Sequence, residues 1–179
     1  MFRKEIRFSG SGGQGIILVA VILAEAAVQA GYFAVQSQSY GPEARGGASK
    51  AEVIFSDQAV DYPKISSPDI FLALSAEAYT KYCHEIKRNG IIVVEETLAI
   101  PNCSTDILRF PVLATARKTG KEITANMVLL GILSSLLEEF LSKTDLEQAI
   151  NQRVPYGTAE VNLLAFNYGY ALRQVAKIQ

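Results

Sequence analysis

Short apolar runs alternate with polar, turn-rich segments through the first two thirds of the chain. Ile6-Arg7-Phe8 alternates apolar and charged residues, whereas later runs such as DIFLAL are apolar throughout, as in strands covered on both faces. The predicted strands cover residues 6–8, 32–35, 50–56, 69–74, 91–94 and 107–110. Strands that alternate with helices predict an α/β fold with a Rossmann-like, mainly parallel sheet flanked by helices.

Two helices are predicted between these strands. The first covers residues 16–30 and ends at Gly31, and the second covers 76–88, with Ser75 as its cap. Residues 6–35 then form a β-α-β unit, in which the two strands run parallel and the crossover is right-handed.

The last third of the chain is predicted to be helical and to pack on the sheet. Helices are expected at 111–119, 123–140, 144–152 and 159–177. Thr144 and Glu147 have the spacing of a capping box. A chain of 179 residues without an internal repeat fits one domain, residues 1–179.

The overall composition narrows the class of protein. The chain is 49% apolar with a net charge of −1, which is typical of a globular protein and provides no basic surface for nucleic acid. No apolar signal-peptide region follows MFRKEIRF, and segment 16–30 is too short to span a bilayer. Cys83 and Cys103 lack the spacing of a zinc or cluster site. We therefore expect a cytoplasmic protein that binds neither membrane nor nucleic acid.

A glycine-rich turn joins the first strand to the first helix. Gly10, Gly12 and Gly15 have the G-x-G-x-x-G spacing, in which glycines allow a tight turn and a close approach of a phosphate to a helix N-terminus. A dinucleotide site also needs an acidic residue at the end of the second strand, but residues 36–38 are Gln-Ser-Gln. The missing acidic residue therefore argues against a dinucleotide-binding site but does not exclude one.

A polar loop follows the second strand, at residues 36–47. Its glycines and proline are typical of a surface turn. However, an Arg45 held between flexible glycines at the end of a parallel strand could pair bidentately with a phosphate or carboxylate. Irregular loops of this length in a compact domain are more often functional, so we expect a ligand contact here.

The usual catalytic constellations are missing from the sequence. His84 is the only histidine and is expected on the solvent side of a helix. Glu95-Glu96 is expected to be a polar strand terminus rather than a catalytic pair. No metal-ligand spacing is present. These observations predict a binding or partner domain that has no complete catalytic site of its own.

Several segments together resemble the gamma subunit of 2-oxoacid:ferredoxin oxidoreductases. They are FSGSGGQGIILVAVILAEAA, SYGPEARGGASKAEVIFSD, YPKISSPDIFLALSAEAYTKY and ITANMVLLG, and the similarity covers essentially the whole chain. The opening RKEIRFSGSGGQGIIL is most similar to the 2-oxoglutarate enzymes. Pyruvate or branched-chain 2-oxoacid enzymes of the same kind are the alternatives.

This resemblance implies a complex that oxidatively decarboxylates a 2-oxoacid with coenzyme A, giving acyl-CoA, CO2 and reduced ferredoxin. Thiamine diphosphate and Mg²⁺ would lie between alpha and beta subunits, and iron–sulfur clusters would lie elsewhere, including a ferredoxin-like delta subunit or ferredoxin. The gamma subunit would bind no cofactor alone but would close the site and assist coenzyme A binding.

The resemblance also implies which residues contact the ligand. Asn126 matches a buried asparagine of the family. The candidate binding residues are Ser39, Tyr40, Gly41, Arg45, Gly46 and Gly47 from the loop and Gly12, Gly13 and Gln14 from the turn. Two other functions stay open at this point: a free-standing dinucleotide-binding oxidoreductase and a purely structural subunit.

Overall fold

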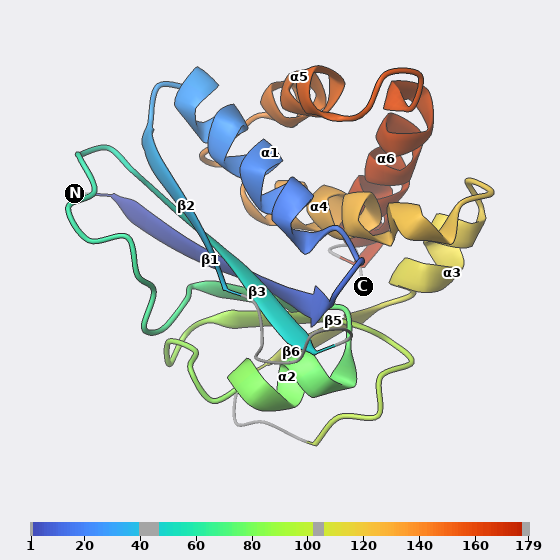
Figure 1. Ribbon diagram of the computed structural model, residues 1–179, viewed down its shortest axis with the longest axis horizontal. Coiled ribbons are helices and arrows are strands. Elements are labelled where there is room, and N and C mark those ends of the chain that lie inside the picture. Colours follow the sequence, from blue (N-terminus) through green and yellow to red (C-terminus); the bar gives the residue numbers. More distant parts are fainter. Residues whose placement is uncertain (1, 40–46, 102–105, 177–179) are drawn as a thin grey trace.

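The computed structural model describes residues 2–39, 47–101 and 106–176, and it shows one mixed sheet with helices on both sides (Figure 1). The strands are β1 (Arg3–Ser11), β2 (Phe33–Ser39), β3 (Ala48–Ser56), β4 (Ile70–Ala73), β5 (Ile91–Glu95) and β6 (Ile107–Phe110). The helices are α1 (Ile16–Gln29), α2 (Ala76–Tyr82), α3 (Val112–Arg117), the 3-10 turn η1 (Glu122–Thr124), α4 (Ala125–Leu136), α5 (Lys143–Arg153) and α6 (Ala159–Ala176).

The strand order is β2-β3-β1-β4-β5-β6. β1, β4, β5 and β6 pair in parallel, whereas β3 is antiparallel to both β1 and β2. Only β3 therefore runs against the other strands of the described chain, and the predicted mainly parallel α/β sheet is confirmed. β1 and β2 run parallel, as expected for the first β-α-β unit, but they are not adjacent, because β3 lies between them.

Helices cover the two faces of the sheet unequally. α1, α4, α5 and α6 lie on one side of the sheet, and α2 lies on the other (Figure 1). The larger core joins one face of the strands to the first group of helices, through residues such as Phe8, Phe55 and Leu130. The smaller core joins the other face to α2 through Phe71 and Tyr79. The prediction that the helical C-terminal third packs on the sheet is confirmed.

α4 and α6 cross with their backbones in close contact. Gly131 of α4 and Gly169 of α6 lie at the crossing, where an added Cβ would collide with the carbonyl oxygens of Phe166 and Val128, respectively. Every α4 residue from Ala125 to Ser135 is buried, which explains why the segment is largely apolar, with Asn126, Ser134 and Ser135 as its only polar side chains.

Some helix boundaries differ from the sequence-based expectation. Ser75 caps α2 as predicted, but α2 ends at Tyr82 instead of residue 88. The expected helix 123–140 is a 3-10 turn followed by the shorter α4. The capping box of α5 uses Ser142 and Asp145, two residues before the predicted pair, because the side chain of Ser142 accepts from the Asp145 backbone.

A buried arginine lies on the α2 side of the sheet. Arg7, the charged residue of the alternating segment Ile6-Arg7-Phe8, is fully buried. Its guanidinium donates to Glu52 Oε1 and Glu85 Oε2, both at 2.6 Å, and to the carbonyl of Ile65 at 2.9 Å. Because these acceptors come from three separate segments, Arg7 ties β1 to β3, to the turn after α2 and to the segment that precedes β4.

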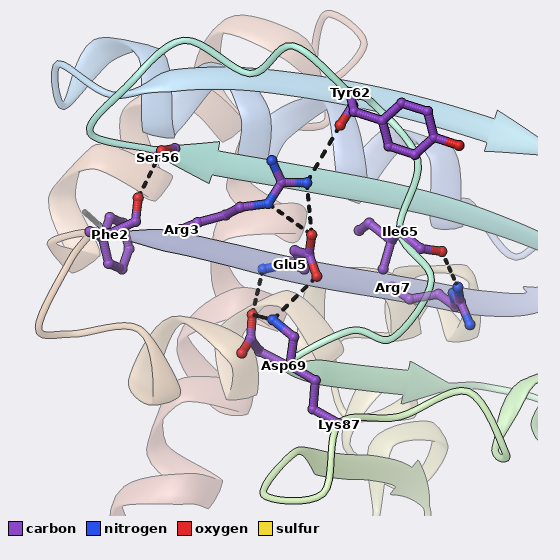
Figure 2. A network of polar contacts seen from close by, with 9 residues as sticks. All are labelled: Phe2, Arg3, Glu5, Arg7, Ser56, Tyr62, Ile65, Asp69 and Lys87. Atoms are coloured by element: carbon purple, nitrogen blue, oxygen red, sulfur yellow. Dashed lines mark hydrogen bonds and ion pairs between the residues drawn. The ribbon is translucent and has the colours of Figure 1, made fainter.

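A second polar group surrounds the start of β1 (Figure 2). Arg3 pairs with Glu5 at 2.8 Å, and Lys87 Nζ lies 2.9 Å from Asp69 and 3.2 Å from Glu5. Partial burial acts to lower the pKa of Lys87, but hydrogen bonds and attraction from Asp69 and Glu5 outweigh it, so the pKa is raised.

Candidate functional site

The glycine turn and Gly47, the described end of the predicted loop, lie at the carboxyl edge of the sheet. Ser11 at the end of β1 pairs with Ala48 at the start of β3, so Gly12 and Gly47 leave the sheet at the same point. Ser49 Oγ donates to the carbonyl of Gly10 at 3.1 Å and fixes β3 against the end of β1. Gly12 of the glycine turn and Gly47 before β3 therefore lie at the same edge of the sheet.

Ser39 and Gly47 are the parts of the predicted loop that the structure describes. Ser39 is the exposed last residue of β2, and Gly47 directly precedes β3. The predicted loop is therefore too long, because residues 36–39 belong to β2. Tyr40, Gly41, Arg45 and Gly46 lie outside the described residues.

Gln14 holds the glycine turn together. Its side-chain oxygen accepts from the backbone N–H of Ser11 at 2.7 Å, and its amide nitrogen donates to the carbonyl of Leu74 at 3.3 Å. A Cβ at Gly10 would lie 2.5 Å from Gln14 Oε1, so glycine at this position leaves room for the Gln14 side chain. Gln14 thereby connects the ends of β1 and β4 around the turn.

Asn126 supports the same turn from α4. Its side-chain nitrogen donates to the carbonyl of Gly15 at 3.2 Å, and its oxygen accepts from the backbone of Met127 at 2.9 Å. Gly15 has a φ of 70°, and an added Cβ would collide with Asn126 Nδ2. The buried Asn126 therefore has a defined task, which sequence spacing alone did not indicate.

The outer side of the turn remains accessible. Gly12 and Gly13 are exposed, and α1 begins directly after the turn with neither a side-chain cap nor an acidic residue in its first turn. Free N–H groups at a helix start are suited to bind an anion. A cavity of about 260 Å³ adjoins the turn, with Gly13, Gly15 and Lys121 in its wall.

The residues weighed as catalytic groups have structural surroundings. Buried Glu95 accepts from Thr97 and from the backbone N–H of Leu113 at 2.8 Å, and so binds the first turn of α3. His84 is exposed in the turn that follows α2. Across residues 2–39, 47–101 and 106–176, no three His, Cys, Asp or Glu side chains gather as a metal site. No helix in these ranges is long and apolar enough to cross a membrane.

A family model described as pyruvate ferredoxin/flavodoxin oxidoreductase matches residues 5–172 of the chain. The chain belongs to this family. The prediction of a gamma subunit of a 2-oxoacid:ferredoxin oxidoreductase is thereby confirmed at the level of the family. The 2-oxoglutarate synthase subunit KorC of Methanocaldococcus jannaschii is 49% identical over 98% of this chain and 95% of its own. The ketoisovalerate oxidoreductase subunit VorA of Methanothermobacter thermautotrophicus is 32% identical over 81% of this chain and 31% of its own.

Solved structures of the family have the same fold. The gamma subunit of a keto/oxoacid ferredoxin oxidoreductase from Geobacter sulfurreducens has a TM-score of 0.88 and 44% identity, covering 98% of this chain and 99% of its own. The 2-oxoglutarate:ferredoxin oxidoreductase of Magnetococcus marinus has a TM-score of 0.87 and 25% identity, covering 98% of this chain but 32% of its own. That structure contains 2-oxoglutarate, coenzyme A and succinyl-CoA.

Proposed function

We propose that this chain is the gamma subunit of a cytoplasmic 2-oxoacid:ferredoxin oxidoreductase whose substrate is 2-oxoglutarate. The observation that carries the proposal is the nearly end-to-end similarity, at 49% identity, to a 2-oxoglutarate synthase subunit. The ketoisovalerate relative is more distant, at 32% identity over a smaller share of the chain. This difference favours 2-oxoglutarate over a branched-chain 2-oxoacid.

Within the complex, the chain would close the active site and assist coenzyme A binding. The support is the shared sheet edge, where the uncapped start of α1 and exposed Gly12 and Gly13 lie beside Ser39 and Gly47. Coenzyme A carries phosphates, which suit helix N-termini and arginine. Tyr40, Gly41, Arg45 and Gly46 complete the proposed contact. Gln14 would contribute through its backbone, since its side chain is already engaged.

The redox cofactors would be held by other subunits. This chain has two cysteines, fewer than the four thiolates that an iron–sulfur cluster usually needs. By the resemblance to the family, thiamine diphosphate with Mg²⁺ would be bound by alpha and beta subunits, and the clusters by a ferredoxin-like delta subunit or ferredoxin. When bound, thiamine diphosphate supplies the carbanion chemistry of the decarboxylation. The described residues of this chain contribute positioning groups and no metal-ligand cluster.

Reconstitution of the complex tests this function. Ferredoxin reduction by the other purified subunits, with 2-oxoglutarate and coenzyme A, should require addition of this chain. In the complex, Arg45→Ala should raise the KM for coenzyme A about tenfold or more, because a hydrogen bond to a charged group contributes about 1.5–3 kcal/mol. Arg88→Ala, at an exposed position in the turn before β5, is the matched control. Full activity without this chain would contradict the proposal.

The strand order argues against the dinucleotide alternative. In dinucleotide-binding folds, the acidic residue that holds the ribose follows the strand beside the glycine turn. Here the antiparallel β3 occupies that place, and β2 ends in Gln38 and Ser39. Calorimetry of the isolated chain with NAD(H), NADP(H) and FAD should therefore show no binding, and tight binding of any of them would restore this alternative.

A further inference from the structure

One face of α6 presents apolar side chains to solvent. Val161, Leu164, Tyr168 and Ala171 follow the i, i+3, i+7, i+10 spacing that places residues on one side of a helix. Leu164 and Tyr168 are 41% and 37% exposed. The side of α6 that includes Ala165, Phe166 and Gly169 is already buried against α4. The exposed stripe is therefore not needed for the core of this domain.

The exposed stripe continues beyond α6. Ile123 in η1 and Tyr156 just before α6 are 72% and 106% exposed. Ile123 and Val161 line the same cavity, which places η1 beside the start of α6. The described part of the chain has seven exposed large hydrophobic residues. Four of them are Ile123, Tyr156, Leu164 and Tyr168. Clustering of this kind marks an interaction surface, whereas single exposed apolar residues do not.

A hollow beside the stripe contains an unsatisfied polar group. Its volume is about 280 Å³, and it is lined by Thr115 and Lys118 together with Tyr168, Ala171 and Leu172. Thr115 is 2% exposed, and its hydroxyl has no hydrogen-bond partner in the structure. A buried hydroxyl without a partner costs free energy, which a polar group entering the hollow would recover. We call the stripe and this hollow the α6 face.

The longer relatives indicate which kind of partner this domain has. This domain makes up 32% of the Magnetococcus marinus chain and 31% of VorA, so their remaining parts are joined to it covalently. In the KorC relative of Methanocaldococcus jannaschii and the Geobacter sulfurreducens gamma subunit, the matching domain covers 95% and 99% of the chain, so such a subunit binds its counterpart through a non-covalent interface. Stable interfaces take about 800 Å² from each partner and centre on tyrosines and apolar side chains.

We propose that the α6 face is the docking site for the subunit that corresponds to the part of the longer chains outside this domain. The proposal rests on the proposed function, because it assumes that this chain belongs to such a complex. The docking segment of the partner carries apolar side chains for Leu164 and Tyr168 and a polar group for Thr115. Acidic residues surround them, because Lys118 and Lys121 border the face and form no ion pair with another described residue.

Direct binding measurements test the α6 face separately from turnover. The partner is the purified subunit whose sequence matches the uncovered part of the Magnetococcus marinus chain, titrated with this chain by calorimetry. Leu164→Asp and Tyr168→Ala should each raise the Kd about tenfold or more, as substitutions at an interface centre do. Val28→Asp, at a 57% exposed position on α1, should change it less than about twofold. Circular dichroism melting confirms that each variant is folded.

A third variant tests the unsatisfied hydroxyl. Thr115→Val should leave the melting temperature of the isolated chain unchanged or higher, since it removes an unpaired polar group, but should raise the Kd about threefold to tenfold. An unchanged Kd would overturn the hydrogen bond assigned to Thr115.

Any one of the following outcomes would overturn the proposal. One is a wild-type Kd for both Leu164→Asp and Tyr168→Ala. Another is a dimer of the isolated chain, seen by sedimentation, that Leu164→Asp dissociates, because a second copy would then cover this face. If the surface variants bind normally while the complex requires this chain for turnover, the proposed function stands and the α6 face is rejected. If the wild-type chain neither binds nor restores turnover, both fall.

Discussion

Removal of the Gln14 side chain tests whether it serves the turn or a ligand. In the structure, both ends of its amide are used, by the backbone N–H of Ser11 and the carbonyl of Leu74. A hydrogen bond contributes about 0.5–1.5 kcal/mol net, so Gln14→Ala should lower the free energy of unfolding by about 1–3 kcal/mol. At about 3 °C for each kcal/mol, the melting temperature of a domain of this size should fall by about 3–9 °C.

Urea unfolding at pH 7, followed by circular dichroism, measures this loss. The matched control is Gln58→Ala, where the glutamine is exposed and the change should stay within about 0.5 kcal/mol. In the reconstituted complex, the KM for coenzyme A should change less for Gln14→Ala than for Arg45→Ala. If Gln14→Ala unfolds at the wild-type midpoint but raises this KM strongly, the side chain contacts the ligand and the structural explanation is wrong.

Three further predictions concern the turn and the buried charges. The added Cβ of Gly13→Ala meets no atom within 4 Å, so this variant should lose only about 1–2 kcal/mol of stability, from the positive φ of the backbone. The Cβ of Gly15→Ala also collides with Asn126, so this variant should lose more stability. Thermal melting compares the two variants. Arg7→Met breaks the buried pair with Glu52, whose carboxylate then keeps only Lys50 at 3.2 Å, and should cost about 3–5 kcal/mol in urea unfolding. Lys87→Met should destabilise the chain at pH 7. Because the pKa of Lys87 is raised by Asp69 and Glu5, this difference is present at neutral pH and is lost only as the pH rises through that raised pKa, which urea midpoints across pH measure.

The element types could be predicted from the sequence because their signals are local. Gly31, with a φ of 92°, ends α1 where expected, and Ser75 caps α2. The apolar runs that became β4 and β5 are short and bounded by turn residues, which leaves little choice of structure. The first residue of a helix is harder to predict where two capping patterns lie close together, as at the start of α5. Ser142, not Thr144, caps α5, because Asp145 also accepts a hydrogen bond from the backbone N–H of Ser142.

Strand order and burial could not be predicted from local patterns. β3 follows β2 along the chain but pairs with both β1 and β2, and this arrangement depends on contacts between distant segments. Local alternation does not reveal that Arg7 is buried, because the burial comes from α2 and the segment before β4, which cover that face of the sheet. Glu95 likewise acquires its role only when the start of α3 packs against the end of β5.

The strand order also changes what the G-x-G-x-x-G spacing means in this fold. Gly10 faces the side chain of Gln14. Its carbonyl accepts from Ser49 of β3, because β3 lies beside β1. The first glycine therefore serves internal packing. Gly15 likewise leaves room for Asn126 of α4. Only the middle of the turn and the N–H groups of α1 face outward, where they can meet an anion but cannot select one. Recognition of a particular ligand therefore has to come from neighbouring side chains, and the proposed contact residues that flank Ser39 and Gly47 are our candidates for that role.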